Sequence, residues 1–337
     1  MNRGLAWVFI GGIVGAGFAS GEEIWLFFGR YGSFGFLGIV LSGFMLGAFG
    51  GAILSWAAKE RTRDHRGLFE RLMGKRTALF ADIVLSCFLF IIVAVMEAAG
   101  GEIGRQFSPA SGNLFIFFMI ILAGLCLWRP GGIVAINSIL VPVLLLLLLL
   151  ISAASFKLPA AADPLPKPAL PWWLAAFFYA SYNLLLVFSA LVGLAEKLDS
   201  LKAGRSTSFF ASFILSSLNC IVLAAILRQP QSNLPILALA NSLGSAFRLS
   251  YIVTLFCAVF TSLLAAVWGL GKRLESIIPE LWGELVILIL AWPVSQFGFA
   301  KIVAGCYPLF GSLGFLLLIL LWAGSVRKNR VALLWVK

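Results

Sequence analysis

Charged residues and histidine are scarce in this chain. Only 12% of its 337 residues are charged and there is one histidine, whereas 61% are hydrophobic. The mean hydropathy is +1.02. A soluble domain is nearer half apolar and about a quarter charged. Since a water-soluble fold could not bury this much apolar surface, the sequence predicts a polytopic membrane protein. The same composition excludes a disordered chain, a secreted disulfide scaffold, a collagen-like chain and a nucleic-acid-binding module.

The few residues that usually carry intramembrane chemistry or bind metals are badly placed for it. The single histidine, His65, lies in a charged connection next to Asp64 and Arg66, outside any apolar run. The cysteines are odd in number, scattered within apolar runs and without C-x-x-C spacing, which favours neither disulfides nor a metal site. They are Cys87, Cys126, Cys220, Cys257 and Cys306. We therefore expect no enzyme, no metal site and no cofactor.

Ten apolar segments are long enough to be read as membrane spans, for which a helix needs ~20 residues. They cover residues 4–30, 34–57, 78–103, 112–128, 131–151, 172–196, 205–227, 248–270, 283–299 and 301–324. A cytoplasmic N-terminus puts most of the 25 Lys and Arg residues on the inside. The sequence thus predicts an all-α protein of the bacterial inner membrane with both termini in the cytoplasm.

The first span is interrupted by glycine. Five glycines and two carboxylates fall between Gly11 and Glu23. Glycine costs about 1 kcal/mol against alanine inside a helix, which predicts unwinding near the bilayer centre. Such backbone is tolerated only where it is buried in protein or lines a cavity. Ser20 and Glu23 match a capping box that restarts a helix, so half-helices are expected at about 4–13 and 21–30.

Two other interpretations apply to this segment. Close helix packing would explain the glycines, but it accounts for neither the carboxylates nor the capping box. Capping would explain Glu23 without any ligand, whereas Glu22 has no such local partner and is the more interesting residue.

A second polar interruption, Tyr179–Asn183 (YASYN), falls near the middle of the sixth span, 172–196. With ten spans divided evenly, the sixth span corresponds to the first one in a second, inverted half. Paired interruptions in matching positions are the best sequence indication of a transporter binding site.

Hydroxyl groups and small residues follow single faces of other spans. Ser250, Thr254 and Thr261 share one face of the eighth span, with Ser262 beside it. Such oxygens suit a small alkali cation, although they can equally bond to carbonyls of their own helix. In the second span the glycines repeat every four residues, which indicates a tight packing seam. These glycines are Gly43, Gly47 and Gly51.

The third span contains three carboxylates. Asp82 and Glu102 are interpreted as interfacial, whereas Glu97 lies within the span. Intramembrane carboxylates are costly and indicate function by default. A proton- or amine-binding role for Glu97 is therefore favoured, with a purely structural role as the alternative. No lysine or arginine lies deep in any span, so a substrate ammonium, a metal cation or a proton must neutralise a buried carboxylate.

The segment Gly11 to Glu23, with Gly15 to Glu23 (GAGFASGEE) as its core, resembles the first helix of YkvI-like membrane proteins. Tyr307–Gly311 (YPLFG) also looks like that family. These are amino acid permeases of the amino acid–polyamine–organocation superfamily. The resemblance implies the LeuT fold, with two inverted five-helix repeats and broken helices one and six. The implied divisions are a first repeat at 1–151, an extracellular linker at 152–171, a second repeat at 172–324 and a cytoplasmic tail at 325–337.

The resemblance also implies which residues bind. Substrate contacts would come from Gly15, Ala16, Gly17 and Ser20 in the first span and from Tyr179, Ser181 and Asn183 in the sixth. A sodium site would use Gly12, Gly15, Thr261 and Ser262. Sodium-independent relatives carry a lysine in the fifth span, where this chain has Asn137 and Ser138. Sodium is thus favoured over a fixed ammonium, while a proton on Glu22 or Glu97 remains an alternative.

These observations predict a secondary active transporter of a small amino acid or organic amine that works by alternating access. The half-helix starting at Gly21 would direct its positive end at a carboxylate, and the one ending near Ile13 its negative end at a cation. Glu22 or Glu97 would hold an ammonium group. The expected partners are the substrate and the lipid bilayer, with sodium or protons as coupling ion, in a monomer or homodimer.

Two other classes stay open. Relatives with this frame sense nutrients in spore germination, binding an amino acid without moving it. A cation or metal pathway through the carboxylates is the other alternative, although the lack of His and Met near the first interruption disfavours soft metals.

Overall fold

The computed structural model of the chain describes residues 3–62, 64–127, 133–160, 165–198, 200–275 and 278–334. Within the helices, it leaves out the side chains of residues 3, 16, 133–139, 197, 280, 281 and 329–334. The described residues form helices and no strand. The helices are α1 (Arg3–Ile13), α2 (Ala16–Ser20), α3 (Glu22–Phe27), η1 (Gly29–Tyr31), α4 (Ser33–Glu60), α5 (His65–Met73), α6 (Lys75–Arg105), α7 (Ser111–Leu127), α8 (Ile133–Ser155), α9 (Trp172–Leu194), η3 (Ala195–Lys197), α10 (Leu201–Ile226), α11 (Pro235–Leu243), α12 (Ser245–Leu274), α13 (Glu280–Ser295) and α14 (Phe299–Leu334).

Six of the described helices are long and apolar enough to cross a membrane: α4, α6, α9, α10, α12 and α14. Four shorter apolar segments accompany them, at Gly4–Ile13, Ser111–Leu127, Leu140–Ser155 and Trp282–Ser295. Each of the ten lies largely within one of the spans expected from the sequence. The chain is therefore a multi-pass, all-helical membrane protein.

The first expected span consists of three short helices. After α1 ends at Ile13, Gly15 is extended, with φ −101° and ψ −167°. Gly21 separates α2 from α3 in the left-handed region, with φ 81°, a conformation that glycine adopts without a steric penalty. The expected capping box is wrong, because Gly21 is the N-cap of α3 and no side chain caps it. Ser20 Oγ instead donates to the carbonyl of Gly17 at 2.9 Å and accepts from the Glu22 N–H at 3.2 Å.

The break expected in the sixth span is wrong for this structure, because α9 runs continuously from Trp172 to Leu194. The polar side chains that suggested a break bond back along the helix. Ser181 Oγ donates to the carbonyl of Phe177 at 2.7 Å, and Asn183 Nδ2 donates to that of Tyr179 at 3.0 Å. These bonds satisfy the side-chain donors without opening the backbone.

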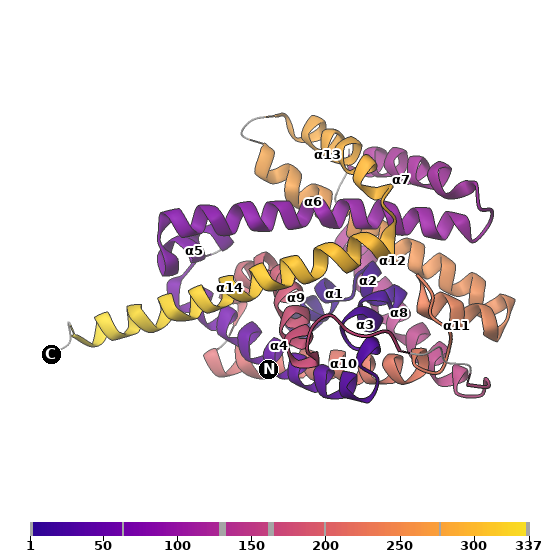
Figure 1. Cartoon of the computed structure of the whole chain (residues 1–337). Helices are drawn as coiled ribbons and strands as arrows, with labels where there is room; N and C mark the ends of the chain where they lie inside the picture. Colours follow the sequence, from indigo (N-terminus) through magenta and orange to yellow (C-terminus); the bar gives the residue numbers. More distant parts are fainter. Residues whose placement is uncertain are drawn as a thin grey trace.

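The interrupted segment lies in the middle of the bundle. Figure 1 shows α1, α2 and α3 enclosed by longer helices, with α4 and α10 on one side and α6 on the other. The helices α7 and α13 pack together against α6, whereas α4 packs against α9 and α10. At one end of the bundle lie α5 and the C-terminal part of α14, and α11 lies at the opposite end (Figure 1).

The glycine seam of α4 faces α10. A Cβ added to Gly43 would overlap Oγ of Ser216, and one added to Gly47 would lie 2.6 Å from Cδ1 of Phe209. At Gly51 it would lie 3.1 Å from Cα of Arg205. The packing interpretation of this repeat is confirmed.

A similar close approach between α9 and α14 gives a test of the fold. A Cβ at Gly311 would lie 2.8 Å from the carbonyl oxygen and 2.9 Å from Cα of Phe178. Because backbone atoms cannot rotate away, Gly311→Ala should force the helices apart and cost about 1–3 kcal/mol. The unfolding midpoint in an SDS titration, followed by circular dichroism, measures this loss.

Gly305→Ala is the matched control on the same helix, since nothing lies within 4 Å of a Cβ added there. It should be neutral or slightly stabilising because alanine is the better helix former, by up to about 1 kcal/mol. Equal midpoints for the two variants would contradict the packing of α9 on α14.

Candidate functional site

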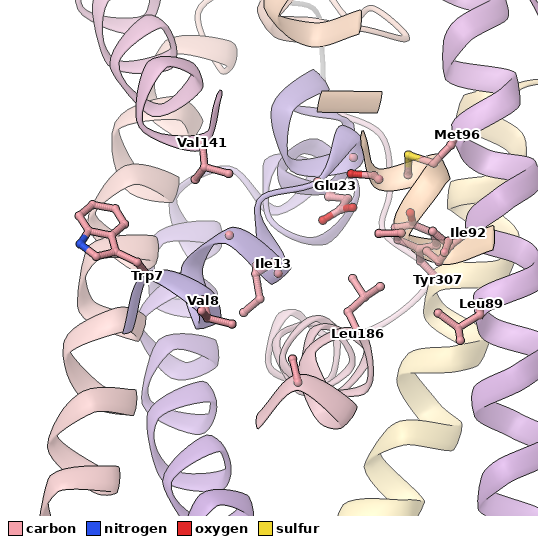
Figure 2. Close-up of a pocket in the computed structure, with 18 of the residues that line it drawn as sticks. Trp7, Val8, Ile13, Glu23, Leu89, Ile92, Met96, Val141, Leu186 and Tyr307 are labelled. Atoms are coloured by element: carbon pink, nitrogen blue, oxygen red, sulfur yellow. The ribbon is translucent and has the colours of Figure 1, made fainter. Parts of the chain in front are cut away.

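A cavity of about 670 Å³ lies against the interruption between α1 and α2 (Figure 2). It extends from Gly17 along α1 to Gly4 in the first turn of that helix. The lining residues come from α1, α2, α3, α6, α8, α9, α12 and α14 and from the connection at Gly15. They are Gly4, Trp7, Val8, Gly11, Gly12, Ile13, Gly15, Gly17, Glu23, Leu89, Ile92, Met96, Val141, Pro142, Leu186, Ala190, Ser262, Ala265, Ala266 and Tyr307. The cavity is thus apolar over most of its wall.

Glu23 is the one lining residue with a formal charge, and no Lys, Arg or His accompanies it among the lining residues described. Its side chain is 3% exposed. The hydroxyl of Tyr182 donates a hydrogen bond to Oε2 of Glu23. Figure 2 places this carboxylate in the middle of the cavity wall, between Ile13 and Tyr307. The cavity therefore presents one anchored carboxyl group in apolar surroundings.

Aromatic packing holds Tyr182 in position. Its ring lies 5.3 Å from that of Phe27 on α3 and 4.9 Å from that of Tyr307 on α14. The ring of Tyr179 stands perpendicular to it at 5.6 Å. Three helices therefore fix the direction from which the hydroxyl reaches Glu23.

Gly17 provides the space for the Glu23 side chain. A Cβ at position 17 would overlap Oε1 of Glu23 and lie 2.8 Å from its Cγ. Any larger residue at this position would displace the carboxylate. One role of glycine in the interrupted segment is thus to admit a carboxylate beside the backbone.

Part of the residue set expected from the sequence meets at this cavity. Gly12, Gly15, Gly17 and Ser262 all line it. A Cβ at Gly15 would lie 3.6 Å from Oγ of Ser262, so α12 approaches the interruption closely. The backbone of residue 16 begins α2, while its side chain lies outside the described part of the chain.

The other expected site residues are not among those lining the cavity. They are Ser20, Glu22, Glu97, Tyr179, Ser181, Asn183 and Thr261. Thr261 Oγ1 donates to the carbonyl of Cys257 at 2.9 Å, and Thr254 Oγ1 to that of Ser250 at 2.8 Å. For these threonines the alternative interpretation, bonding within their own helix, is the observed one. Tyr179 accepts a hydrogen bond from Nδ2 of Asn219 at 3.1 Å.

Sequence reasoning favoured Glu22 over Glu23, and it named Tyr182 only as part of the polar interruption. The side-chain direction in α3 depends on the left-handed turn at Gly21, which resets the helical phase. No periodicity across the interruption indicates which of the two carboxylates faces the cavity. Glu22 is itself 4% exposed.

A polar cluster lies where α5 meets the bundle. His65 Nε2 lies 3.0 Å from both Asp82 Oδ1 and Arg273 Nη2, and Arg273 Nη1 donates to Asp82 Oδ1 at 2.7 Å. His65 Nδ1 lies 3.2 Å from Ser189 Oγ. These contacts connect α5, α6, α9 and α12. Burial, and next the guanidinium of Arg273, lower the pKa of His65 from its ordinary value, while Asp82 opposes this shift.

This lowered pKa predicts a pH-dependent stability. Above the ordinary histidine pKa of about 6.5, the ring is neutral in both the folded and unfolded chains. As the pH falls through that value, the unfolded chain gains a proton that the folded chain disfavours, so stability decreases. Between pH ~7 and ~5, the melting temperature of the wild type should fall more steeply than that of His65→Gln.

The chain has a single histidine, so the difference between the two pH profiles reports on His65 and the residues that it contacts. A difference that stays constant with pH would contradict the described environment of His65.

No protein-family model matches the chain. Two proteins of Bacillus subtilis (strain 168) are similar over most of their length. The membrane protein YkvI is 27% identical over 316 residues, covering 91% of each chain. The protein YyaD is 29% identical over 330 residues, covering 95% of this chain and 96% of YyaD.

Solved structures of transporters have a similar fold. Inward-facing Mhp1 aligns with a TM-score of 0.60 and 13% identity, over 92% of this chain and 72% of Mhp1. A closed form of Mhp1, described as a nucleobase-cation-symport-1 family transporter with bromovinylhydantoin bound, gives 0.60 and 15%, over 91% and 74%. A variant of the manganese transporter of Eremococcus coleocola gives 0.59 and 15%, over 94% and 76%. The chain is therefore a multi-pass membrane protein with the fold of LeuT-type transporters.

Proposed function

We propose that the protein is a secondary active transporter of a small amino acid or organic amine. In this proposal ten segments cross the membrane, with α1, α2 and α3 together as the first and α9 as the sixth. The N-terminus lies in the cytoplasm. The observation that carries the proposal is the Glu23 carboxylate in an apolar cavity at the interruption of the first span.

The charge of the cavity favours a positively charged group on the substrate. An ionised carboxylate in apolar surroundings is costly unless a cation or a proton neutralises it. No basic side chain is found among the described lining residues. A substrate ammonium would pair with Glu23 while its apolar body contacts the aliphatic wall. The ring of Tyr307 is available for a cation–π contact with the same group.

The two ends of the cavity differ in a way that suits alternating access. Toward the first turn of α1 it reaches Gly4. On the other side of the interruption, the hydroxyl of Tyr251 donates to the carbonyl of Ala19. A Cβ at Gly21 would lie 2.9 Å from Cγ1 of Ile236 on α11. With the N-terminus in the cytoplasm, this arrangement faces inward, and loosening α11 and Tyr251 would open the outer path.

Sodium and protons are the two candidate coupling ions. The proposed sodium site is formed by Gly12, Gly15 and Ser262, which line the same cavity, because backbone carbonyls and a hydroxyl are hard oxygen donors. Thr261 is left out of this site, since it does not line the cavity. The proposal thus narrows the sodium ligands expected from the sequence to three residues.

Transport of a transition metal receives less support. The described residues include no group of three or more His, Cys, Asp or Glu side chains that could hold a metal ion. Divalent cations nevertheless belong in the screen below, since one aligned structure is described as a manganese transporter.

The first experiment is a thermal-shift screen of the purified protein against amino acids, amines and divalent cations, with and without sodium. Ligand stabilisation follows RT ln(1 + [L]/Kd), so a weak ligand is detected at high concentration. An amine or amino acid hit is then tested for uptake into vesicles. Binding without uptake would indicate a sensor, and a shift with divalent cations alone would contradict the amine proposal.

Glu23→Gln should remove the stabilisation by the amine or amino acid, because the amide keeps the shape of the side chain but not its charge. We expect at least a tenfold loss of affinity, about 1.4 kcal/mol, measured by the concentration dependence of the thermal shift. Glu22→Gln is the matched control, since Glu22 is the adjacent buried carboxylate but does not line the cavity. Unchanged affinity in Glu23→Gln together with a loss in Glu22→Gln would overturn the assignment.

A further inference from the structure

Glu97 is another buried carboxylate that lies outside the cavity. Glu97 on α6 is 0% exposed, and no donor among the described residues bonds to either of its carboxylate oxygens. Its neighbour Met96 lines the cavity, whereas Glu97 lies near Ser295 at the end of α13. Two adjacent residues of α6 thus lie in different places: Met96 in the cavity wall, and Glu97 in the buried contact with the end of α13.

The nearby turn of α13 contributes polar groups but no charge. Ser295 Oγ donates to the carbonyl of Trp292 at 2.7 Å, so its hydrogen is already used. Nε1 of Trp292 is buried and has no hydrogen-bond partner among the described residues. Its ring packs at 5.3 Å from that of Phe117 on α7. Both helices therefore bring a buried polar group without a described hydrogen-bond partner to this contact: the Glu97 carboxyl group on α6 and Nε1 of Trp292 on α13.

The charged groups of α6 and α13 are used elsewhere or lie far along their helices. On α6, Glu102 pairs with Arg105 at 3.1 Å, and Asp82 pairs with Arg273 at the opposite end. On α13, Glu284 lies eleven residues before Ser295, about 16 Å along the helix axis. None of these groups provides a counter-ion for Glu97.

The other helices packed against α6 do not provide one either. On α12, Arg248 donates to the carbonyl of Gln106 at 2.7 Å and Tyr251 to that of Ala19. On α14, Lys301 is exposed and Tyr307 lines the cavity. The sequence of α7 contains no charged residue.

A carboxylate without a counter-ion in this position must bind a proton or a metal cation. A metal ion such as calcium takes six to eight oxygen ligands, and the described surroundings of Glu97 offer one carboxylate and one hydroxyl. A proton requires only the carboxylate.

We infer that Glu97 is a proton-binding site, and that the proton it binds and releases is the coupling ion. The carboxylic acid is the resting form. Release of the proton as H⁺ leaves a carboxylate, which requires water or a donor to enter between α6 and α13. A movement of α6 would also displace Met96, which lines the cavity. The coupling part of this inference rests on the proposed transport function, whereas the proton site does not.

The proton site is tested without any ligand, by infrared difference spectroscopy of the purified protein in lipid bilayers. A protonated carboxyl has a C=O band apart from those of amides and carboxylates, and this band shifts when deuterium replaces the proton. At neutral pH the wild type should show the band, Glu97→Gln should lose it, and the matched control Glu102→Gln should keep it. Glu97→Asp should shift the frequency of this band, so the test can still be made if Glu97→Gln does not fold.

Transfer to D₂O then separates an exchanging site from a structural one. A shift of the Glu97 band is the expected result. If Glu97→Gln removes no band, the residue is ionised and the inference is overturned. A band that never shifts in D₂O shows a permanently bound proton and also overturns it.

The coupling is tested with the compound that stabilises the wild type most in the thermal-shift screen. An inward pH gradient should stimulate its uptake into vesicles by the wild type, and Glu97→Gln should lose this stimulation. If the wild type takes up the compound at the same rate with and without the gradient, the coupling is overturned. No uptake of any compound would instead contradict the proposed transport function, while the infrared result would still decide the proton site.

Discussion

The hydrogen bond from Tyr182 to Glu23 links the interrupted first span to the continuous helix α9. A carboxylate in the membrane interior is tolerated when a polar partner and a cavity surround it. Gly17 leaves the space for the side chain, and the left-handed turn at Gly21 directs it inward. The glycines, the aromatic cluster around Tyr182 and the cavity are therefore parts of one arrangement that places a single carboxyl group in the wall of an apolar cavity.

Two of the buried carboxylates, Glu23 and Glu97, lie in different environments. Glu23 has a hydrogen-bond donor and faces a cavity that can admit a cation. Glu97 has no hydrogen-bond donor among the described residues and is not part of the lining. This contrast suggests a division of roles, with substrate charge at Glu23 and a proton at Glu97. Adjacent residues of α6, Met96 and Glu97, would allow the two sites to influence each other without direct contact.

The two ends of the bundle are held by different interactions. Near α11, close packing on Gly21 and the hydrogen bond from Tyr251 cover the interrupted segment. Near α5, His65, Asp82 and Arg273 connect α5 to α6, α9 and α12 through polar contacts. Apolar packing is insensitive to pH, whereas a buried histidine between a carboxylate and a guanidinium is not. The contacts at the second end therefore depend on protonation.

The sequence by itself determined the membrane class, the helical segments, the interruption after Ile13 and the glycine seam of α4, because hydropathy and glycine act locally. It did not determine which polar residues meet. The expected break at Tyr179–Asn183 failed because Ser181 and Asn183 bond to carbonyls four residues earlier, a choice that depends on packing. Only the tertiary structure selected Glu23 over Glu22 and brought Tyr182 to it. The turn at Gly21 resets the helical phase, and a contact across 159 positions of the chain leaves no local signal.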